Sequence, residues 1–287
     1  MSDFTFLITA FNPGKFIFTT INSILNQTYS DFFIIYIDDA STDLSISYLE
    51  KIEDQRLKII KNKEKIGLIN SLNMGIDLVT TKYIIRFDAD DILLPTFLEN
   101  KITEIEDDVI LIGENILITD KYLNIKGKTN FPRNDSSIKK QLLRLKSSIN
   151  QPGVLINKAA VIKAGYYKHV KAAEDYDLWL RMMKFGKFKN TNKYLLLYRV
   201  TGNSLTNLTF NDIPCTNILS LSNWENNILD SKLSKVYIYL YKKYNYSRGF
   251  SFVKLLYFPV YTVYRIIFSK YLVLKYYKLK PADTASL

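Results

Sequence analysis

The sequence contains very few of the residues on which several common kinds of site depend. Among 287 residues there is one cysteine, Cys215, and one histidine, His169. A single cysteine excludes an internal disulfide framework and fits a reducing compartment. A single histidine argues against a histidine-based metal cluster or a Ser-His-Asp triad. No run reaches the roughly 18 uncharged apolar residues that a membrane-spanning helix needs, and no basic segment typical of a secretory signal is present. We therefore expect a cytoplasmic protein.

Acidic residues are nearly absent from one part of the chain. The net charge is +11, but residues 231–287 contain eleven Lys or Arg residues and a single acid, Asp283, so they carry +10 and the first 230 residues carry +1. The same segment holds eleven of the 21 tyrosines. Aromatic and basic segments can lie on anionic membrane surfaces, where each Lys or Arg contributes about 1 kcal/mol. The alternative is a helical appendage that packs on protein, with its bases in solvent.

Apolar runs and amphipathic segments alternate regularly along the first part of the chain. The patterns predict strands at residues 4–9, 32–37, 57–61, 82–87, 109–119, 153–157 and 194–199. Helices are predicted at residues 14–26, 41–52, 66–79, 95–105, 136–145, 158–164 and 175–185, with a loop at 121–135. Asn12 with Pro13, and Ser41, are expected to begin the first two helices. This rhythm predicts an α/β fold with a mostly parallel sheet covered by helices on both faces. The composition shifts near residue 215, so we expect one domain at 1–214 and a basic, Tyr-rich helical region at 215–287.

Three carboxylates follow the fourth predicted strand. They are Asp88, Asp90 and Asp91, in the stretch Arg86-Phe-Asp-Ala-Asp-Asp91. A strand that ends in acids leaves them at the carboxyl edge of a sheet, where open α/β folds bind ligands. Carboxylates at close range repel one another unless a cation lies between them, and hard oxygen ligands suit Mg²⁺ or Mn²⁺ carrying a substrate phosphate. Taken alone, however, the stretch fits a solvated acidic turn better.

Other strand ends carry residues that suit a nucleotide. Residues 9–12 follow the first strand, and Asp39 follows the second. Phe11 could stack on a base, and Asp39 could accept a hydrogen bond from the imide N–H of uracil. Asp90 and Asp91 could hold the cation that bridges a diphosphate. A nucleotide site typically lies at the carboxyl ends of neighbouring strands, at the point where the strand order reverses.

Five motifs together resemble the family 2 glycosyltransferases, which have the GT-A fold. In chain order they are Phe6-Leu-Ile-Thr-Ala-Phe-Asn12, Ser23-Ile-Leu-Asn-Gln-Thr28, Ile37-Asp-Asp-Ala-Ser-Thr-Asp43, Gly67-Leu-Ile-Asn-Ser-Leu-Asn-Met-Gly75 and Phe87-Asp-Ala-Asp-Asp91. A further match is Glu174-Asp175 with residues 179–181 following, so that the resemblance covers about residues 3–200. It implies a Rossmann-like GT-A domain with a nucleotide-sugar half at about 1–110 and an acceptor half at about 111–214.

The resemblance also implies a set of site residues. The nucleotide-binding residues would be Thr9, Ala10, Phe11, Asn12, Asp39, Gly67, Asn73, Asp88 and Asp90. Asp90 and Asp91 would bind Mn²⁺ or Mg²⁺. Asp175 would be the catalytic base, with Glu174 orienting it or the acceptor. The chain departs from the family pattern at Leu72, where Arg is common, and at residues 150–152, where a His is common.

An Asp at a helix start also has a purely structural explanation, because capping and the helix dipole favour it there. The upstream motifs make the catalytic interpretation of Asp175 the stronger one. Asp38 is expected to support its loop, and Arg86 to pair with one of the neighbouring acids. Trp179 is expected to face the core, and residues 151–153 to line an acceptor cleft.

The implied activity is the non-processive, inverting transfer of one sugar from a nucleotide-sugar, with UDP favoured, to a saccharide or lipid-linked saccharide of a bacterial surface polysaccharide. A departing diphosphate needs a metal rather than a proton donor, and the attacking hydroxyl needs one carboxylate base. Glycosidases differ, because they use two carboxyl groups across the bond. The Gln/Arg-x-x-Arg-Trp motif of processive members is absent. With a lipid-linked acceptor, the protein would lie on the inner face of the cell membrane, which the basic tail at 231–287 could contact.

Two other functions fit the sequence less well. A sugar nucleotidyltransferase normally has a Gly-rich phosphate loop with Arg or Lys after its first strand, whereas residues 10–15 contain one Gly and one Lys. A nucleic-acid-binding protein could act through the basic tail, but the near-neutral charge of the remaining chain argues against it. We therefore expect a nucleotide-sugar donor and a saccharide acceptor as partners, and no nucleic acid.

Overall fold

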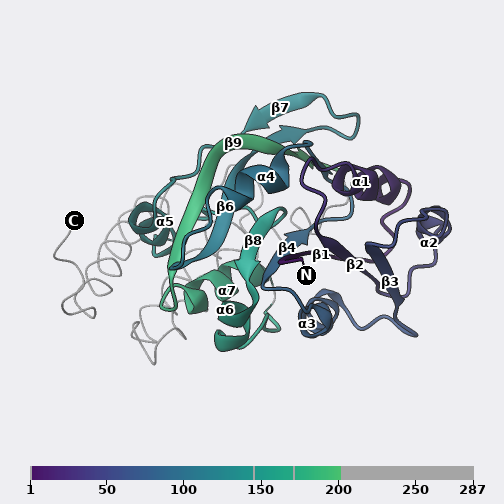
Figure 1. Cartoon of the computed structure of the whole chain (residues 1–287), viewed down its shortest axis with the longest axis horizontal. Coiled ribbons are helices and arrows are strands. Elements are labelled where there is room, and N and C mark those ends of the chain that lie inside the picture. Colours follow the sequence, from purple (N-terminus) through teal and green to yellow (C-terminus); the bar gives the residue numbers. More distant parts are fainter. Residues whose placement is uncertain (1, 145, 171, 202–287) are drawn as a thin grey trace, which may run out of the picture.

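The computed structural model describes residues 2–144, 146–170 and 172–201 (Figure 1). Its strands are β1 Phe4–Ala10, β2 Phe33–Asp38, β3 Leu57–Lys61, β4 Tyr83–Phe87, β5 Ile92–Leu93, β6 Val109–Thr119, β7 Ile125–Lys128, β8 Val154–Asn157 and β9 Lys187–Arg199. Its helices are α1 Phe16–Leu25, α2 Ser45–Leu49, α3 Leu68–Leu78, α4 Phe97–Ile102, α5 Asp135–Leu142, α6 Lys158–Lys163 and α7 Glu174–Met182. The predicted domain boundary at residue 215 and the basic tail lie outside the described residues.

One sheet runs through the whole of this region, in the order β3-β2-β1-β4-β8-β6-β9-β5, with β7 paired to β6. The first four of these strands are parallel, as predicted. Beyond β4 the sheet is mixed, because β8 runs antiparallel to both β4 and β6 while β9 is parallel to β6. The parallel strands therefore all end at one edge, which brings the predicted site segments together.

Helices cover both faces of the parallel strands, as the alternation of elements predicted. Phe6 and Ile8 of β1 pack with Ile17 and Ile21 of α1 in one buried cluster. Leu7, which lies between them in the strand, belongs to the opposite cluster, together with residues of α3. Successive side chains of a strand point to opposite faces, so β1 contributes to two hydrophobic cores. Figure 1 shows α1 and α3 on opposite sides of β1 and β2.

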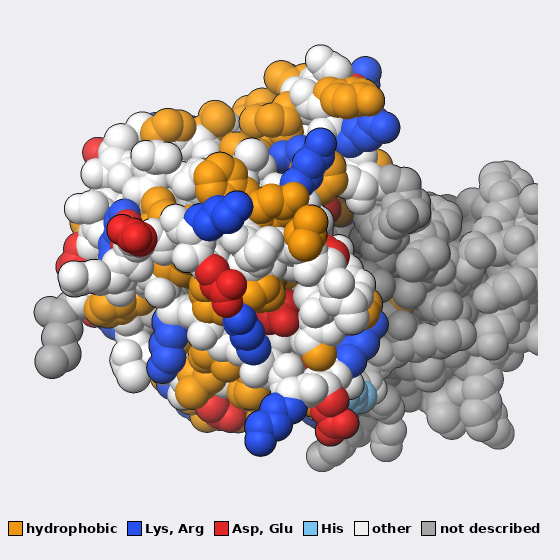
Figure 2. Space-filling model, turned by 90° about the vertical axis from the view of Figure 1, so that its right-hand side faces the viewer, with side chains coloured by type: hydrophobic (Ala, Val, Ile, Leu, Met, Phe, Trp, Pro, Cys, Tyr) orange, Lys and Arg blue, Asp and Glu red, His pale blue; other side chains and the backbone are white. Residues whose placement is uncertain are grey.

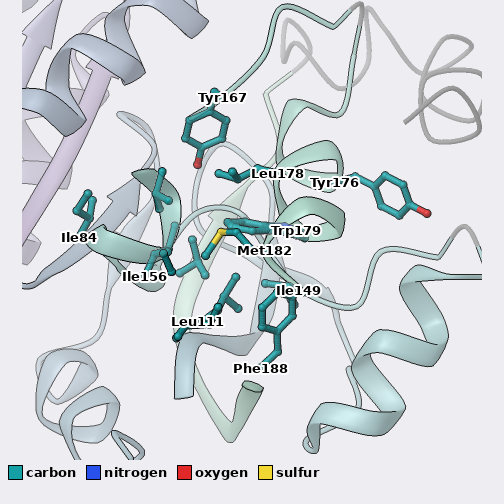
Figure 3. Close-up of a cluster of buried hydrophobic side chains, with 14 of the residues drawn as sticks. Ile84, Leu111, Ile149, Ile156, Tyr167, Tyr176, Leu178, Trp179, Met182 and Phe188 are labelled. Carbon is teal, nitrogen blue, oxygen red and sulfur yellow. The ribbon is translucent and has the colours of Figure 1, made fainter. Parts of the chain in front are cut away.

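Helix α7 is anchored in the larger cluster by its apolar face. Figure 3 shows Trp179 and Met182 of α7 close to Leu111 of β6 and Ile156 of β8, whereas Tyr176 points away from them. Trp179 is buried, as predicted. The anchoring matters for function because the first residues of the same helix are the acids Glu174 and Asp175.

Several predicted boundaries are wrong. β7 lies in the segment predicted as a loop, β5 was not predicted, and β9 begins at Lys187 rather than at residue 194. The early part of β9 is polar, but it pairs with β6. The buried side chain of Asn190 there donates to the carbonyls of Pro132 and Ser148, at 2.7 and 2.8 Å. Pairing and remote hydrogen bonds stabilise a strand that its hydrophobic pattern does not indicate.

The two predicted N-caps are also wrong. Helix α1 begins at Phe16 and α2 only at Ser45, and neither has a side-chain cap. Instead, Asn12 and Ser41 join two loops: the amide of Asn12 donates to Ser41 Oγ at 2.9 Å, and Asn12 Oδ1 accepts from the amide of Thr42 at 2.7 Å. Both residues therefore fix the shape of the sheet edge rather than the start of a helix.

No helix in residues 2–144, 146–170 and 172–201 has the length and apolar character needed to cross a bilayer.

Replacing Trp179 tests the anchoring of α7. We expect Trp179→Ala to lower the free energy of unfolding by about 3–5 kcal/mol, because a large buried ring leaves a cavity. Urea denaturation followed by circular dichroism measures this change. Leu44→Ala is the control, because Leu44 is 67% exposed, and it should change stability by less than about 0.5 kcal/mol. Equal stabilities of the two variants would contradict the anchoring role.

Candidate active site

The loops that follow β1, β2 and β3 are tied to one another at the carboxyl edge of the sheet. The amide of Asp39 donates to the carbonyl of Ala10 at 2.8 Å, and the amide of Asn62 donates to the carbonyl of Asp38 at the same distance. Asp38 supports its own loop, as predicted, because its Oδ2 accepts from the amide of Ser41 at 3.1 Å. The loops thus form a fixed rim around the strand ends.

The carboxylate of Asp39, one of the predicted nucleotide-binding residues, is held by several hydrogen bonds. Its Oδ1 accepts from the Ile66 amide at 2.8 Å and from Asn62 Nδ2 at 2.9 Å, and its Oδ2 accepts from the Gly67 amide at 2.9 Å. Burial opposes its ionisation, but the hydrogen bonds from Asn62, Ile66 and Gly67 outweigh burial and lower the pKa of Asp39. The side chain of Ser71 is a fourth hydrogen-bond partner that also lowers this pKa, so the carboxylate holds residues 62–67 against the start of α3.

Gly67 is required at its position because its φ of 88° lies in the left-handed region. It directly precedes α3 and directs its amide at Asp39. A side chain at this position would strain the turn and disturb the contact with the carboxylate.

The end of β1 contributes an exposed ring and an unpaired hydroxyl. Phe11 is exposed, and Lys65 Nζ lies 3.4 Å from the centroid of its ring. Among the described residues, the buried Thr9 Oγ1 has no hydrogen-bond partner. Ala10 lies between them and is partly buried. Asn12 is occupied by the loop contacts described above. The Phe11 ring is thus the exposed group at this strand end, and the Thr9 hydroxyl lies beneath the surface without a partner in the described part of the chain.

Asn73 lies on α3, and its side chain binds the backbone of Tyr167. Its Nδ2 donates to the carbonyl of Tyr167 at 2.9 Å, and its Oδ1 accepts from the amide of Tyr167 at 3.0 Å. Both ends of the amide group are therefore engaged, and Asn73 positions the segment that leads into α7.

The acids after β4 form a turn that is held by backbone and side-chain contacts. Thr20 Oγ1 of α1 donates to the carbonyl of Asp91 at 2.8 Å. Arg199, at the end of β9, donates through Nε to the carbonyl of Asp90 at 2.7 Å, and its amide donates to Asp91 Oδ1 at 2.8 Å. Asp88 forms an ion pair with Arg86, as predicted. Residues 88–91 therefore form a turn that is held by the surrounding structure, and not a loose, solvated turn.

Burial and mutual repulsion raise the pKa values of the acids in this turn. Burial and then the charge of Asp88 raise the pKa of Asp90 to about 6, against the opposing effect of Arg199. Burial, Asp88 and Asp90 raise the pKa of Asp91. Crowded acids of this kind accommodate a cation well, since a bound cation favours their ionised forms.

The oxygen atoms at this turn fit a divalent cation that also binds a ligand. Asp91 Oδ2 is buried and has no hydrogen-bond partner among the described residues. Within the same parts of the chain, no three His, Cys, Asp or Glu side chains are grouped to hold a metal ion by themselves. Mg²⁺ is commonly bound by one or two carboxylates together with substrate phosphates, and Asp90 and Asp91 fit that mode.

Helix α7 brings a second pair of acids to the same place. Its N-cap is Ala173, in a left-handed conformation with φ 54° and no side-chain cap. Asp175 is thus not the capping residue, and its Oδ1 accepts from the adjacent amide of Tyr176 at 2.7 Å. Burial and the charge of Glu174 raise the pKa of Asp175 to about 7, although Tyr176 and Arg86 act in the opposite direction.

Arg86 lies between the two groups of acids. It is buried and pairs with Asp88. Burial opposes its charge, but Asp88, Tyr167 and Glu174 outweigh burial and raise the pKa of Arg86. Because one guanidinium interacts with Asp88 after β4 and with Glu174 of α7, the two acidic groups lie within electrostatic range of each other.

Two further groups at the site were not predicted from the sequence, Arg199 and Tyr167. Arg199 holds the acidic turn, and its guanidinium also lies 4.3 Å from the centroid of the Phe16 ring. The Tyr167 side chain is buried among Arg86, Gln151, Glu174 and Asp175, and burial raises its pKa. A basic residue at the end of a predicted strand was the available signal for Arg199. Tyr167 gave no local signal.

The amide of Gly153 donates to the carbonyl of Arg86 at 2.8 Å, which places residues 151–153 beside the site.

The amino-acid sequence of this chain is similar to those of known proteins. The family description "Glycosyl transferase family 2" matches residues 5–170. An uncharacterized glycosyltransferase of Haemophilus influenzae is 34% identical over 218 residues, which are 70% of this chain and 67% of the relative. WfaP of Escherichia coli, a UDP-Glc:alpha-D-GlcNAc-diphosphoundecaprenol beta-1,3-glucosyltransferase, is 29% identical over 208 residues, which are 72% of this chain and 81% of WfaP.

Two solved structures share the fold. S. aureus TarS 1-349 in complex with UDP-GlcNAc superposes with a TM-score of 0.65 and 16% identity, over 95% of this chain and 82% of TarS. The mannosyltransferase PcManGT of Pyrobaculum calidifontis, in complex with GDP-Man and Mn²⁺, has a TM-score of 0.59 and 13% identity, over 96% of this chain and 86% of its own. At these identities the likeness concerns the fold, which is the GT-A fold expected from the sequence.

The position of Arg86 leads to a prediction about Asp175. We expect Arg86→Gln to raise the pKa of Asp175 by about one unit, because a nearby cation favours the ionised carboxylate. Carboxyl carbon-13 NMR over a pH titration measures it. The control is Arg56→Gln, which removes an ion pair with Asp54 in the segment before β3. If Asp175 has the same pKa in the wild-type protein, in Arg86→Gln and in Arg56→Gln, Arg86 does not control this pKa.

Proposed function

Because this chain belongs to the family 2 glycosyltransferases, we propose that it transfers one sugar from a UDP-sugar to a hydroxyl of a saccharide or lipid-linked saccharide, with inversion at the anomeric carbon. The observation that carries the proposal is the convergence of two acidic groups on Arg86, one at the end of β4 and one at the start of α7. One group suits the diphosphate of a donor, and the other suits the hydroxyl of an acceptor.

The nucleotide would lie along the rim formed by the ends of β1 and β2. The ionised carboxylate of Asp39 suits the imide N–H of uracil, which cytosine and adenine lack. Phe11 offers a ring for stacking, and the free hydroxyl of Thr9 offers a polar contact beside it. The solved complex of TarS with UDP-GlcNAc and the UDP-Glc specificity in the name of WfaP agree with a uridine donor.

Asp90 and Asp91 would hold Mn²⁺ or Mg²⁺, with the diphosphate oxygens as further ligands. When bound, the cation supplies the positive charge that stabilises the departing diphosphate. The structure of PcManGT with GDP-Man and Mn²⁺ supports the use of a divalent cation. Asp88 would remain paired with Arg86 and lie toward the ribose.

Asp175 would accept the proton of the acceptor hydroxyl as the hydroxyl attacks the anomeric carbon. A general base works best when its pKa lies near the working pH, and the pKa of Asp175 is raised to about 7 by burial and by Glu174. A single base combined with attack opposite the departing diphosphate inverts the anomeric centre. Glu174 would hold Asp175 at this pKa and orient the acceptor.

The acceptor half of the site lies between residues 151–153 and α7. The amide of Gly153 is fixed by the carbonyl of Arg86, so this segment keeps a constant distance from the acids. The diphosphoundecaprenol-linked acceptor in the name of WfaP favours a lipid-linked saccharide as the substrate here.

Replacing Asp175 tests the assignment of the base. We expect Asp175→Asn to reduce sugar transfer by about 10²–10⁴-fold, while UDP affinity changes less than about twofold. Transfer is measured by UDP release from a panel of UDP-sugars with short saccharide acceptors, and affinity by titration calorimetry. Asp177→Asn is the matched control on the same helix, because Asp177 pairs with Arg181 at 2.7 Å. Weakened UDP binding with transfer retained would refute the assignment.

Replacing Asp91 tests the cation site. Asp91→Asn keeps the acceptor for the Arg199 amide but removes the charge of the buried Oδ2. We expect the Mn²⁺-dependent gain in UDP affinity to fall at least about tenfold, because the loss of even an outer-shell partner of a metal ligand typically costs about 10–100-fold in metal affinity. Calorimetry with and without Mn²⁺ measures it. Asp120→Asn, on the hairpin between β6 and β7, is the control. A Mn²⁺ effect of normal size in Asp91→Asn would place the cation elsewhere.

A further inference from the structure

The hairpin formed by β6, β7 and the turn between them presents apolar side chains to solvent. Tyr122 is 73% exposed, Ile125 61% and Leu123 37%. Val200, which follows β9, is also exposed, and its amide donates to the carbonyl of Thr119 at the base of the hairpin at 2.8 Å. Single exposed apolar residues are common, but a contiguous group of them marks an interaction surface. Figure 2 shows apolar and basic atoms together on the projection at the top of the molecule, where Figure 1 places β7.

Hydrogen bonds hold the turn in its shape, so the exposure of these apolar side chains follows from the fold. Asp120 Oδ1 accepts from the amides of Tyr122 and Asn124 at 2.9 and 3.0 Å, and the amide of Asp120 donates to the carbonyl of Asn124 at 3.1 Å. Hydrogen bonds from the side chain and amide of Asn124 help to lower the pKa of Asp120 to about 2. The carboxylate is thus part of the turn, which holds the apolar side chains outward.

Basic residues surround these apolar side chains. The turn and β7, residues 120–128, carry Lys121, Lys126 and Lys128, against one acid, Asp120, which pairs with Lys126 at 3.2 Å. Lys121 Nζ lies 4.9 Å from the centroid of the Tyr122 ring. Aromatic rings beside Lys or Arg are typical of the headgroup region of membranes, and each basic residue near an anionic surface contributes about 1 kcal/mol to binding. The charge of the hairpin therefore complements an anionic surface.

The base of the hairpin is joined to the acidic turn through Arg199. Arg199 Nη1 donates to the carbonyl of Lys121 at 3.2 Å, while Nε of the same side chain donates to the carbonyl of Asp90 at 2.7 Å. A sugar acceptor linked to a lipid extends from the bilayer, so a docking surface has to lie beside the reacting groups. The hairpin meets that requirement.

We propose that the tip of the β6–β7 hairpin, residues 121–126, docks on an anionic phospholipid bilayer and inserts Tyr122, Leu123 and Ile125 among the headgroups. The inference deepens the proposed function, since it rests on a lipid-linked acceptor. A bilayer is the favoured occupant because a stable protein interface buries about 800 Å² on each partner, and the apolar surface of this tip consists of a few side chains on a narrow projection.

The test uses full-length protein and vesicles, without any nucleotide-sugar. Ile125→Asp should reduce co-sedimentation with vesicles of phosphatidylglycerol and phosphatidylcholine by at least about tenfold relative to the wild-type protein. Leu44→Asp is the matched control, because Leu44 is an aliphatic residue of similar exposure, 67%, at the start of α2. It should bind as the wild-type protein does. Vesicles of phosphatidylcholine alone should bind the wild-type protein more weakly.

A second measurement reports the contact directly, even if another part of the chain also binds lipid. With Cys215→Ser as background, Ile125→Cys labelled with a polarity-sensitive dye should shift to shorter emission wavelength on anionic vesicles, and labelled Leu44→Cys should not. The proposal is wrong if neither label shifts and both Asp variants bind alike. It is also wrong if Ile125→Asp turns a dimer into a monomer on gel filtration and leaves vesicle binding unchanged, because the tip would then be a protein interface. UDP binding by Ile125→Asp should equal that of the wild-type protein, so failure of docking leaves the proposed function standing.

Discussion

A buried guanidinium lies between acids that come from opposite halves of the domain, and the site depends on its charge. Arg86 pairs with Asp88 and lies within electrostatic range of Glu174. Burying one charge costs several kcal/mol unless charges of the opposite sign compensate for it. Here the guanidinium and the neighbouring carboxylates compensate one another. Arg86 favours the ionised forms of Asp90 and Asp175, whose pKa values burial raises to about 6 and about 7. Removal of the guanidinium would therefore raise the pKa values of both carboxyl groups further.

The fold brings these groups together by two different means. Parallel strands end at a common edge, so Asp39 after β2 and Asp88 after β4 lie at the same edge, on either side of β1. Glu174 and Asp175 reach the same edge because Trp179, on the same helix, is packed in the core beyond β8. The nucleotide-binding part of the proposed site is therefore fixed by backbone pairing, and the acceptor part by side-chain packing.

Arg199 gives the acidic turn a second connection, to the surface. One side chain bonds to the carbonyl of Asp90 and to that of Lys121. Under the proposed function, the residue that holds the cation-binding turn also holds the hairpin on which the enzyme would dock. A lipid-linked acceptor would then meet the base and the donor at a set distance from the bilayer. A rigid link of this kind gives orientation, which is a large part of the rate advantage in a transfer between two bound substrates.

The sequence by itself determined the parallel strands with their covering helices, the acids at the end of β4 and the pairing of Arg86 with one of them. Each of these depends on local periodicity or on residues close together in the chain. The tertiary structure alone decided that Asn12 and Ser41 join two loops instead of starting helices, that the polar segment containing Asn190 forms a strand, and that Arg199 holds Asp91 across 108 positions of the sequence. Such contacts join polar groups of segments that are distant in the sequence. They leave no periodic pattern in the sequence, because the partners meet only after the sheet has formed.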